Sequence, residues 1–248
     1  MNAVAAAFVF APALALGSFL NVVAARVPLR RSIVRPPSAC MSCGERIAWY
    51  DNVPVLSWFL LRGRCRHCQA RIPWVYPGVE LATAALVAGC VLAFGVTWDA
   101  LLASFFCAVL VVISAIDLEH RIIPNRIVLP AFVIVLGVQT LLHPSPEWAL
   151  AALGASGFLF AAAVAYPAGM GMGDVKLALL MGAMLGRVVP VSLMLGMLLA
   201  LLPSVVLVAR HGAAARKMGI PFGPFLALGS VIGLFWGDSL LDWYLGII

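Results

Sequence analysis

Residues 100–117 read ALLASFFCAVLVVISAID, an apolar run that carries no charge before its last position. A run of this length and composition is typical of a helix that spans a bilayer, whose hydrocarbon core of about 30 Å needs about 20 such residues. Seven further apolar runs, each bounded by turn or charge signals, occur in the 248-residue chain. The sequence therefore predicts eight membrane helices, at residues 3–25, 77–95, 100–117, 127–142, 147–166, 174–187, 190–209 and 222–247.

The composition supports this interpretation. Hydrophobic residues make up 64% of the chain and charged residues only 10%, and the mean hydropathy is +1.07. This excess over a soluble domain is expected where the surface, as well as the interior, is apolar. The first run has no basic residue before Arg26, so it is predicted to be a retained helix and not a signal peptide. The predicted fold class is an all-α, polytopic membrane helix bundle.

The positive charges indicate an orientation. Of the 16 Lys and Arg residues, 15 lie in the segments 26–76, 118–126, 167–176 and 210–221, which share one side if the N-terminus is outside. Basic loops concentrate on the cytoplasmic side of membrane proteins, so we expect these four segments in the cytoplasm and the N-terminus outside. The same distribution accounts for the net charge of +6, and no nucleic acid partner is predicted.

The segment 26–76 is polar, basic and rich in Pro and Cys, and it is the candidate for a separate soluble subdomain. Residues 1–25 are then the first membrane helix, and residues 77–248 are the membrane core. Two C-x-x-C pairs lie in this segment, 21 residues apart. Such pairs supply a closed tetrahedral zinc site, whereas disulfides are disfavoured in the cytoplasm. We predict a structural zinc ion bound by Cys40, Cys43, Cys65 and Cys68.

Two aspartates at predicted cytoplasmic helix ends are the candidate catalytic residues. Asp117 ends one apolar run, and Asp174 opens another after the loop AGMGMG. An acid near membrane depth is costly and indicates function. The predicted helix 174–187 has 14 residues and spans only about 20 Å, so Asp174 is expected to lie below the membrane surface. Gly169, Gly171 and Gly173 would permit close backbone approach there, by a substrate strand or by another helix.

Two adjacent carboxylates that share one proton can activate water and polarise a scissile carbonyl at the same time. The alternative is that each aspartate only caps a helix. This role suits Asp174 as an N-cap. It suits Asp117 less well, because an acid at a helix C-terminus opposes the helix dipole. Glu80 and Glu119 are possible supporting groups. Asp238 and Asp242 are better explained as a solvated interfacial face near the outer end of the last helix.

Six segments resemble the bacterial prepilin peptidases, a family of GxGD aspartyl proteases. They occur in order along nearly the whole chain: GSFLNVVAARVP (17–28), PPSACMSCGERIAWYDNVPVLSWFLLRGRCRHC (36–68), YPGVELATA (76–84), AIDLEHRIIPNRI (115–127), GMGDVKLA (171–178) and PFGPFLALG (221–229).

The resemblance implies cleavage of leader peptides from type IV prepilins and type II secretion pseudopilins, on the cytoplasmic side of the inner membrane. It implies Asp117 and Asp174 as the catalytic pair, zinc on the four loop cysteines, and N-methylation of the new N-terminus with S-adenosylmethionine. The sequence contains no glycine-rich Rossmann signature that would locate the methyl donor.

Three other functions stay open from sequence. The first is a peptidase that does not methylate. The second is a transporter that uses the two aspartates as a proton or ion relay, although no internal repeat is visible. The third is a membrane-anchored zinc scaffold in which both aspartates are replaceable.

Overall fold

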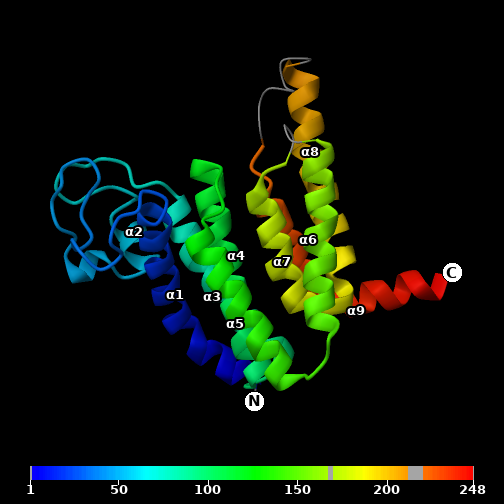
Figure 1. Cartoon of the computed structure of the whole chain (residues 1–248). Coiled ribbons are helices and arrows are strands. Elements are labelled where there is room, and N and C mark those ends of the chain that lie inside the picture. Colours follow the sequence, from blue (N-terminus) through cyan, green and yellow to red (C-terminus); the bar gives the residue numbers. More distant parts are fainter. Residues whose placement is uncertain (1, 167–169, 212–219, 248) are drawn as a thin grey trace. The chain divides into compact units, whose positions relative to one another are not determined.

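The structure, a computed structural model, describes residues 2–166, 170–211 and 220–247. These residues form helices and connecting segments and contain no strand. The long helices are α1 (Asn2–Arg26), α3 (Val75–Phe94), α4 (Trp98–His120), α5 (Asn125–Leu142), α6 (Glu147–Ala165), α7 (Met172–Leu185), α8 (Val189–His211) and α9 (Gly223–Ile247). Shorter helices are η1 (Trp49–Asp51), α2 (Leu56–Leu60) and η2 (Gly186–Val188) (Figure 1).

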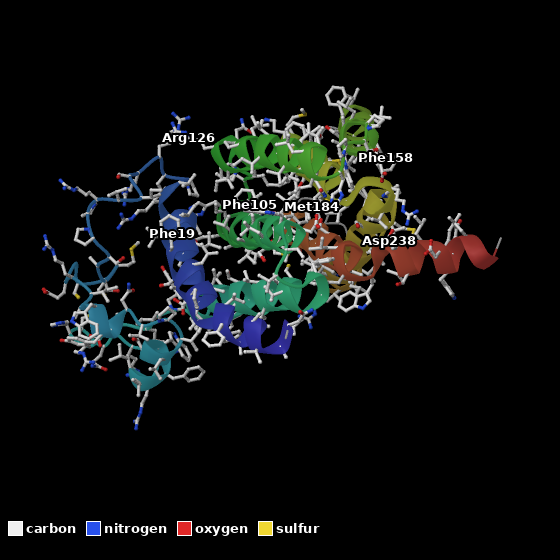
Figure 2. The ribbon with its side chains drawn as sticks, turned by 90° about the horizontal axis from the view of Figure 1, so that it is seen from below. Phe19, Phe105, Arg126, Phe158, Met184 and Asp238 are labelled. Atoms are coloured by element: carbon white, nitrogen blue, oxygen red, sulfur yellow. The ribbon has the colours of Figure 1, made fainter. Side chains whose placement is uncertain are left out.

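These eight long helices correspond to the eight predicted runs, and the all-α fold class is confirmed. In the part of the chain that the structure describes, seven segments are long and apolar enough to cross a bilayer. One of them, residues 172–207, joins α7, η2 and most of α8 into a continuous apolar segment of 36 residues. Large apolar side chains on the helix exteriors, such as Phe19 on α1 and Phe158 on α6, are exposed (Figure 2). The chain is therefore a multi-pass membrane protein whose surface apolar groups suit lipid.

The chain divides into two compact units, Met1–Ile116 and Asp117–Ile248. In the first unit α1 packs along α3, where Gly17 lies so close to Glu80 that a Cβ at position 17 would be 2.6 Å from the Glu80 Cα (Figure 1). The sulfurs of Cys90 on α3 and Cys107 on α4 lie 3.9 Å apart in its interior. The predicted domain boundaries after residues 25 and 76 stay a prediction.

The second unit is built around α7. Nine of its 14 residues are buried, and it contacts α5, α6 and α9. A Cβ at Gly182 would collide with the backbone of Ala151 and Ala152 on α6, so only glycine allows this approach. Gln139 on α5 donates a hydrogen bond to the Met184 carbonyl oxygen, at 3.2 Å. The hydrophobic effect contributes little between helices in lipid. Small residues at helix crossings let the backbones approach closely, and the resulting van der Waals packing stabilises the bundle.

Gly182→Ala is expected to lower the free energy of unfolding in detergent by about 1–3 kcal/mol, because the added methyl group must push α6 away from α7. Gly137→Ala is the matched control, since a Cβ at Gly137 inside α5 meets nothing within 4 Å. Equal unfolding free energies for the two variants would contradict the importance of this helix crossing.

Candidate active site and metal centre

Asp117 lies in the last turn of α4, because the helix continues to His120 beyond the predicted end. Its side chain is only 6% exposed. The backbone N–H of Gly223, the first residue of α9, donates to Asp117 Oδ2 at 2.9 Å. A Cβ at Gly223 would lie 2.9 Å from the same oxygen, so a larger residue would displace the carboxylate.

Asp174 lies in the first turn of α7, which begins at Met172, two residues earlier than predicted. The N–H of Gly171, the N-cap residue, donates to Asp174 Oδ2 at 3.2 Å. Asp174 is therefore not the N-cap residue that the alternative from sequence proposed. It is the third residue of the helix, and its carboxylate accepts the N–H of the N-cap residue. The helix has 14 residues, the predicted length, and spans about 20 Å.

The second unit brings the two aspartates together. The negative charges of Asp117 and Asp174 are close enough to interact electrostatically. The connection between α4 and α5 lies on the first turn of α7, where Ile123 packs on Gly173 so closely that a Cβ there would be 2.9 Å from the Ile123 Cβ. Lys176 Nζ donates to Asn125 Oδ1 at 2.8 Å and joins α7 to the start of α5.

Close backbone approach was predicted at three glycines. At Gly173 the approaching group is Ile123 of the chain itself. At Gly171 it is the carboxylate of Asp174, 3.5 Å from a Cβ built there. Gly169 lies outside the described residues.

Sequence reasoning on spacing alone did not find Gly223, Asn125 or Lys176 as partners of the site. The only signal for Gly223 was the block PFGPFLALG. A single glycine at a helix start gives no hydrophobic or charge pattern in the sequence. Its role is recognised only from the contact between its N–H and the Asp117 carboxylate in the structure.

The other acids are accounted for elsewhere. Glu80 belongs to the first unit and accepts the Val55 N–H at 2.6 Å. Glu119 is exposed in the last turn of α4. Asp238 pairs with Arg187 at 2.7 Å and its side chain is 68% exposed (Figure 2). Asp242 is also exposed, so these two acids lie on the surface, as an interfacial position requires.

The four loop cysteines form one cluster. Their sulfurs all lie within 4.8 Å of one another, and Cys40 Sγ is 3.7 Å from Cys68 Sγ. Four sulfurs around a zinc ion, at about 2.3 Å each, are about 3.8 Å apart in a tetrahedron. The cluster therefore fits a zinc ion with four protein ligands and no open position.

Two similar turns present these cysteines. The antiparallel bridge between Ala39 and Arg46 closes the first turn, and that between Arg64 and Arg71 closes the second. In the first, the Cys40 N–H donates to the Glu45 carbonyl, and in the second the Cys65 N–H donates to the Ala70 carbonyl, both at 2.9 Å. The residue after the second cysteine has positive φ in each turn, +74° at Gly44 and +58° at Gln69.

Two neighbouring thiols of the cluster, Cys40 and Cys43, have pKa values that are shifted in opposite directions. Backbone hydrogen bonds from Cys43 and Ser42 lower the pKa of Cys40 to about 6. A backbone hydrogen bond from Glu45 lowers the pKa of Cys43, but desolvation and the neighbouring thiols raise that pKa to about 12. The ionised Cys40 sulfur thus favours the protonated form of Cys43. Thiolates are the form that binds a dication, so a metal ion in the cluster would favour ionisation of both.

Comparison with known proteins gives two family matches. Residues 12–94 match the bacterial Peptidase A24 N-terminal domain, and residues 104–209 match the type IV leader peptidase family. Two proteins named prepilin leader peptidase/N-methyltransferase are similar over most of their length. The one from Bacillus subtilis is 34% identical over 236 residues, covering 94% of each chain. The one from Aeromonas hydrophila is 34% identical over 270 residues, covering 96% of this chain and 92% of its own.

The protein of that name from Myxococcus xanthus is 49% identical over 125 residues, which cover 50% of this chain and 37% of that protein. No solved structure matches this chain.

Metal analysis of the purified protein is expected to find about one zinc ion per chain. Cys40→Ser should lose the zinc ion and expose the segment 26–76 to proteases, because a segment with little core depends on the metal for its fold. Cys90→Ser, which alters a cysteine on the membrane helix α3, is the control and should retain zinc. Full zinc content in Cys40→Ser would contradict the assignment.

Proposed function

Since the chain belongs to the type IV leader peptidase family, we propose that this enzyme removes the leader peptides of type IV prepilins and type II secretion pseudopilins. The observation that carries the proposal is the meeting of two carboxylates from different helices, Asp117 on α4 and Asp174 on α7, within electrostatic range of each other. Each is held by a backbone N–H, at 2.9 and 3.2 Å.

In the proposed mechanism the two carboxyl groups share one proton. The ionised group takes a proton from a water molecule, whose oxygen attacks the carbonyl carbon of the scissile peptide bond. The protonated group donates a hydrogen bond to the carbonyl oxygen. As the tetrahedral adduct collapses, the carboxyl group that took a proton from water gives it to the leaving nitrogen. The C–N bond breaks, which leaves a carboxylate on the leader and an amine on the mature chain. A coupled pair titrates as a unit, so the roles belong to the pair and are not divided between Asp117 and Asp174.

Two helix N-termini converge on the pair. Asp174 lies in the first turn of α7, and Asp117 accepts the N–H of the first residue of α9. The partial positive charge at a helix start stabilises an anion, whereas mutual repulsion of the two carboxylates opposes a second negative charge. This combination supports the singly ionised state that the mechanism requires.

We further propose that the protein resides in the bacterial inner membrane, with a periplasmic N-terminus and an active site that faces the cytoplasm. The location of 15 of the 16 basic residues in alternate loops supports this orientation. The proposed organisation is a first membrane helix (1–25), a cytoplasmic zinc-binding domain (26–76) and a membrane protease core (77–248). Zinc held by the four cysteines is structural, because a fully protein-ligated ion has no position for water or substrate.

The proposal includes N-methylation of the new N-terminus, supported by the name N-methyltransferase on the relatives. S-adenosylmethionine supplies a methyl group: the amine lone pair forms the N–C bond, the C–S electron pair stays on sulfur, and the amine gives up a proton.

Asp117→Asn and Asp174→Asn are each expected to lower the cleavage rate by about 100-fold to 10,000-fold, the range for loss of general acid–base catalysis. The measurement is leader removal from a purified prepilin in detergent. Asp242→Asn, at an exposed acid on α9, is the matched control and should cleave normally. Full cleavage by either active-site variant would exclude that aspartate from the mechanism.

Gly223→Ala is expected to lower kcat by roughly 10- to 100-fold, because the methyl group displaces the Asp117 carboxylate and small misplacements of catalytic groups are costly. A Cβ at Gly246, near the end of the same helix, meets nothing within 4 Å, so Gly246→Ala is the control. Unchanged kcat in Gly223→Ala, with the control also normal, would show that this hydrogen bond does not position the carboxylate.

A further inference from the structure

A cavity in the first unit has no role in the proposed hydrolysis. It lies between α1, the cysteine-bearing segment and the start of α3, and its volume is about 270 Å³. Ligand pockets are commonly about 300–1,000 Å³, so this volume is near the lower end of that range. Its lining comes entirely from residues 18–80, whereas both catalytic aspartates belong to the second unit.

Two buried polar residues from membrane helices form part of the cavity wall. Glu80 on α3 is 7% exposed and Asn21 on α1 is 9% exposed. Glu80 Oε2 accepts the Val55 N–H at 2.6 Å, and Asn21 Nδ2 donates to the Tyr76 carbonyl oxygen at 3.0 Å. A carboxylate at such a position is expensive to bury, and its place beside a cavity suits a ligand that carries positive charge.

The backbone opposite Glu80 is strained. Val55 has φ +61°, a conformation that is rare for a β-branched residue. The Glu80 carboxylate holds its N–H, and Ser57 Oγ fixes the same turn by accepting the Val53 N–H at 3.0 Å and donating to the Tyr50 carbonyl oxygen at 3.0 Å. Strain that is maintained by buried hydrogen bonds occurs preferentially at binding sites.

The rest of the lining combines both signs of charge with aromatic groups. Arg66 makes a bidentate ion pair with Asp51, at 2.6 and 2.7 Å, which fixes both side chains at the cavity. The indole N–H of Trp58 donates to the Ile72 carbonyl oxygen at 3.1 Å and holds the ring in place. Further charged lining residues are Arg26, Glu45, Arg46 and Arg71.

These groups match the chemistry of one ligand class. S-adenosylmethionine carries an aromatic purine, a ribose diol, a positively charged sulfonium, and an amino acid end with an ammonium and a carboxylate. A buried carboxylate suits the cationic groups, arginines suit the carboxylate, and an aromatic ring suits the purine.

We infer that this cavity binds S-adenosylmethionine, with Glu80 next to the sulfonium group of the donor. The inference deepens the proposed function and rests on its methyl-transfer step. Glu80 therefore acts in donor recognition within the first unit, and the aspartate pair of the second unit acts in cleavage.

Equilibrium dialysis of the zinc-loaded, full-length protein in detergent tests this inference with labelled S-adenosylmethionine and with S-adenosylhomocysteine. The second ligand lacks the sulfonium charge but retains the purine, the ribose and the amino acid end. Glu80→Gln keeps one carbonyl oxygen as an acceptor for the Val55 N–H, removes the negative charge and replaces the other oxygen with an NH2 group. It should weaken S-adenosylmethionine binding by about 10-fold or more. Binding of S-adenosylhomocysteine should change much less, because its sulfur is neutral.

Val22→Trp is the second variant, since Val22 lines the cavity from α1 and an indole there fills it. It should abolish the binding of both ligands, whereas Asp242→Asn, on α9, should bind both as the wild type does. Zinc content, measured on every variant, reports folding of the cysteine-bearing segment.

The inference is overturned if Glu80→Gln retains the wild-type preference for the sulfonium ligand, or if Val22→Trp binds both ligands normally. Leader cleavage by the wild type is measured in the same preparation. Cleavage without any donor binding would overturn the inference and leave the peptidase proposal intact. Donor binding without cleavage would overturn the peptidase proposal instead.

Discussion

The hydrogen bond from the Gly223 N–H to Asp117 Oδ2 joins the start of α9 to the last turn of α4 across 106 positions of sequence. A buried carboxylate is tolerated only when polar partners replace its lost hydration. Here the partner is a helix N-terminus, which also contributes partial positive charge. Asp174 obtains the same kind of support from the start of α7. The geometry of the acid pair therefore depends on where two helices begin, and those starts depend on the glycine-mediated packing of the bundle.

The close packing of the bundle buries most of α7, which is also short. A 14-residue helix spans only about 20 Å, and a bilayer accepts non-helical backbone at depth only where protein or water satisfies it. The Ile123 contact and the Lys176–Asn125 hydrogen bond place the connection between α4 and α5 over the start of α7. The chain itself therefore covers part of the start of α7, next to Asp174.

The first unit meets a different constraint. The cysteine-bearing segment has few buried apolar residues, so two similar turns and their sulfur cluster take the place of a hydrophobic core. Both the cysteine spacing and the presence of eight apolar runs were readable from sequence, since ligand spacing and bilayer thickness impose them directly. The cavity beside Glu80 could not be predicted from the sequence, because its wall combines residues of α1, α3 and a turn in which Val55 has positive φ. Sequence analysis could name Glu80 only as a possible supporting group for the aspartates.

By itself the sequence determined that this chain is a helical membrane protein, which residues form each apolar run, and that Asp117 and Asp174 are candidates for one site. Local composition decides these properties, because the bilayer selects apolar helices and makes each acid conspicuous. Only the tertiary structure decided that the two acids meet, that Gly223 supports Asp117, and that Glu80 faces a separate cavity. Those relations depend on contacts between residues far apart in the chain, which no local pattern encodes.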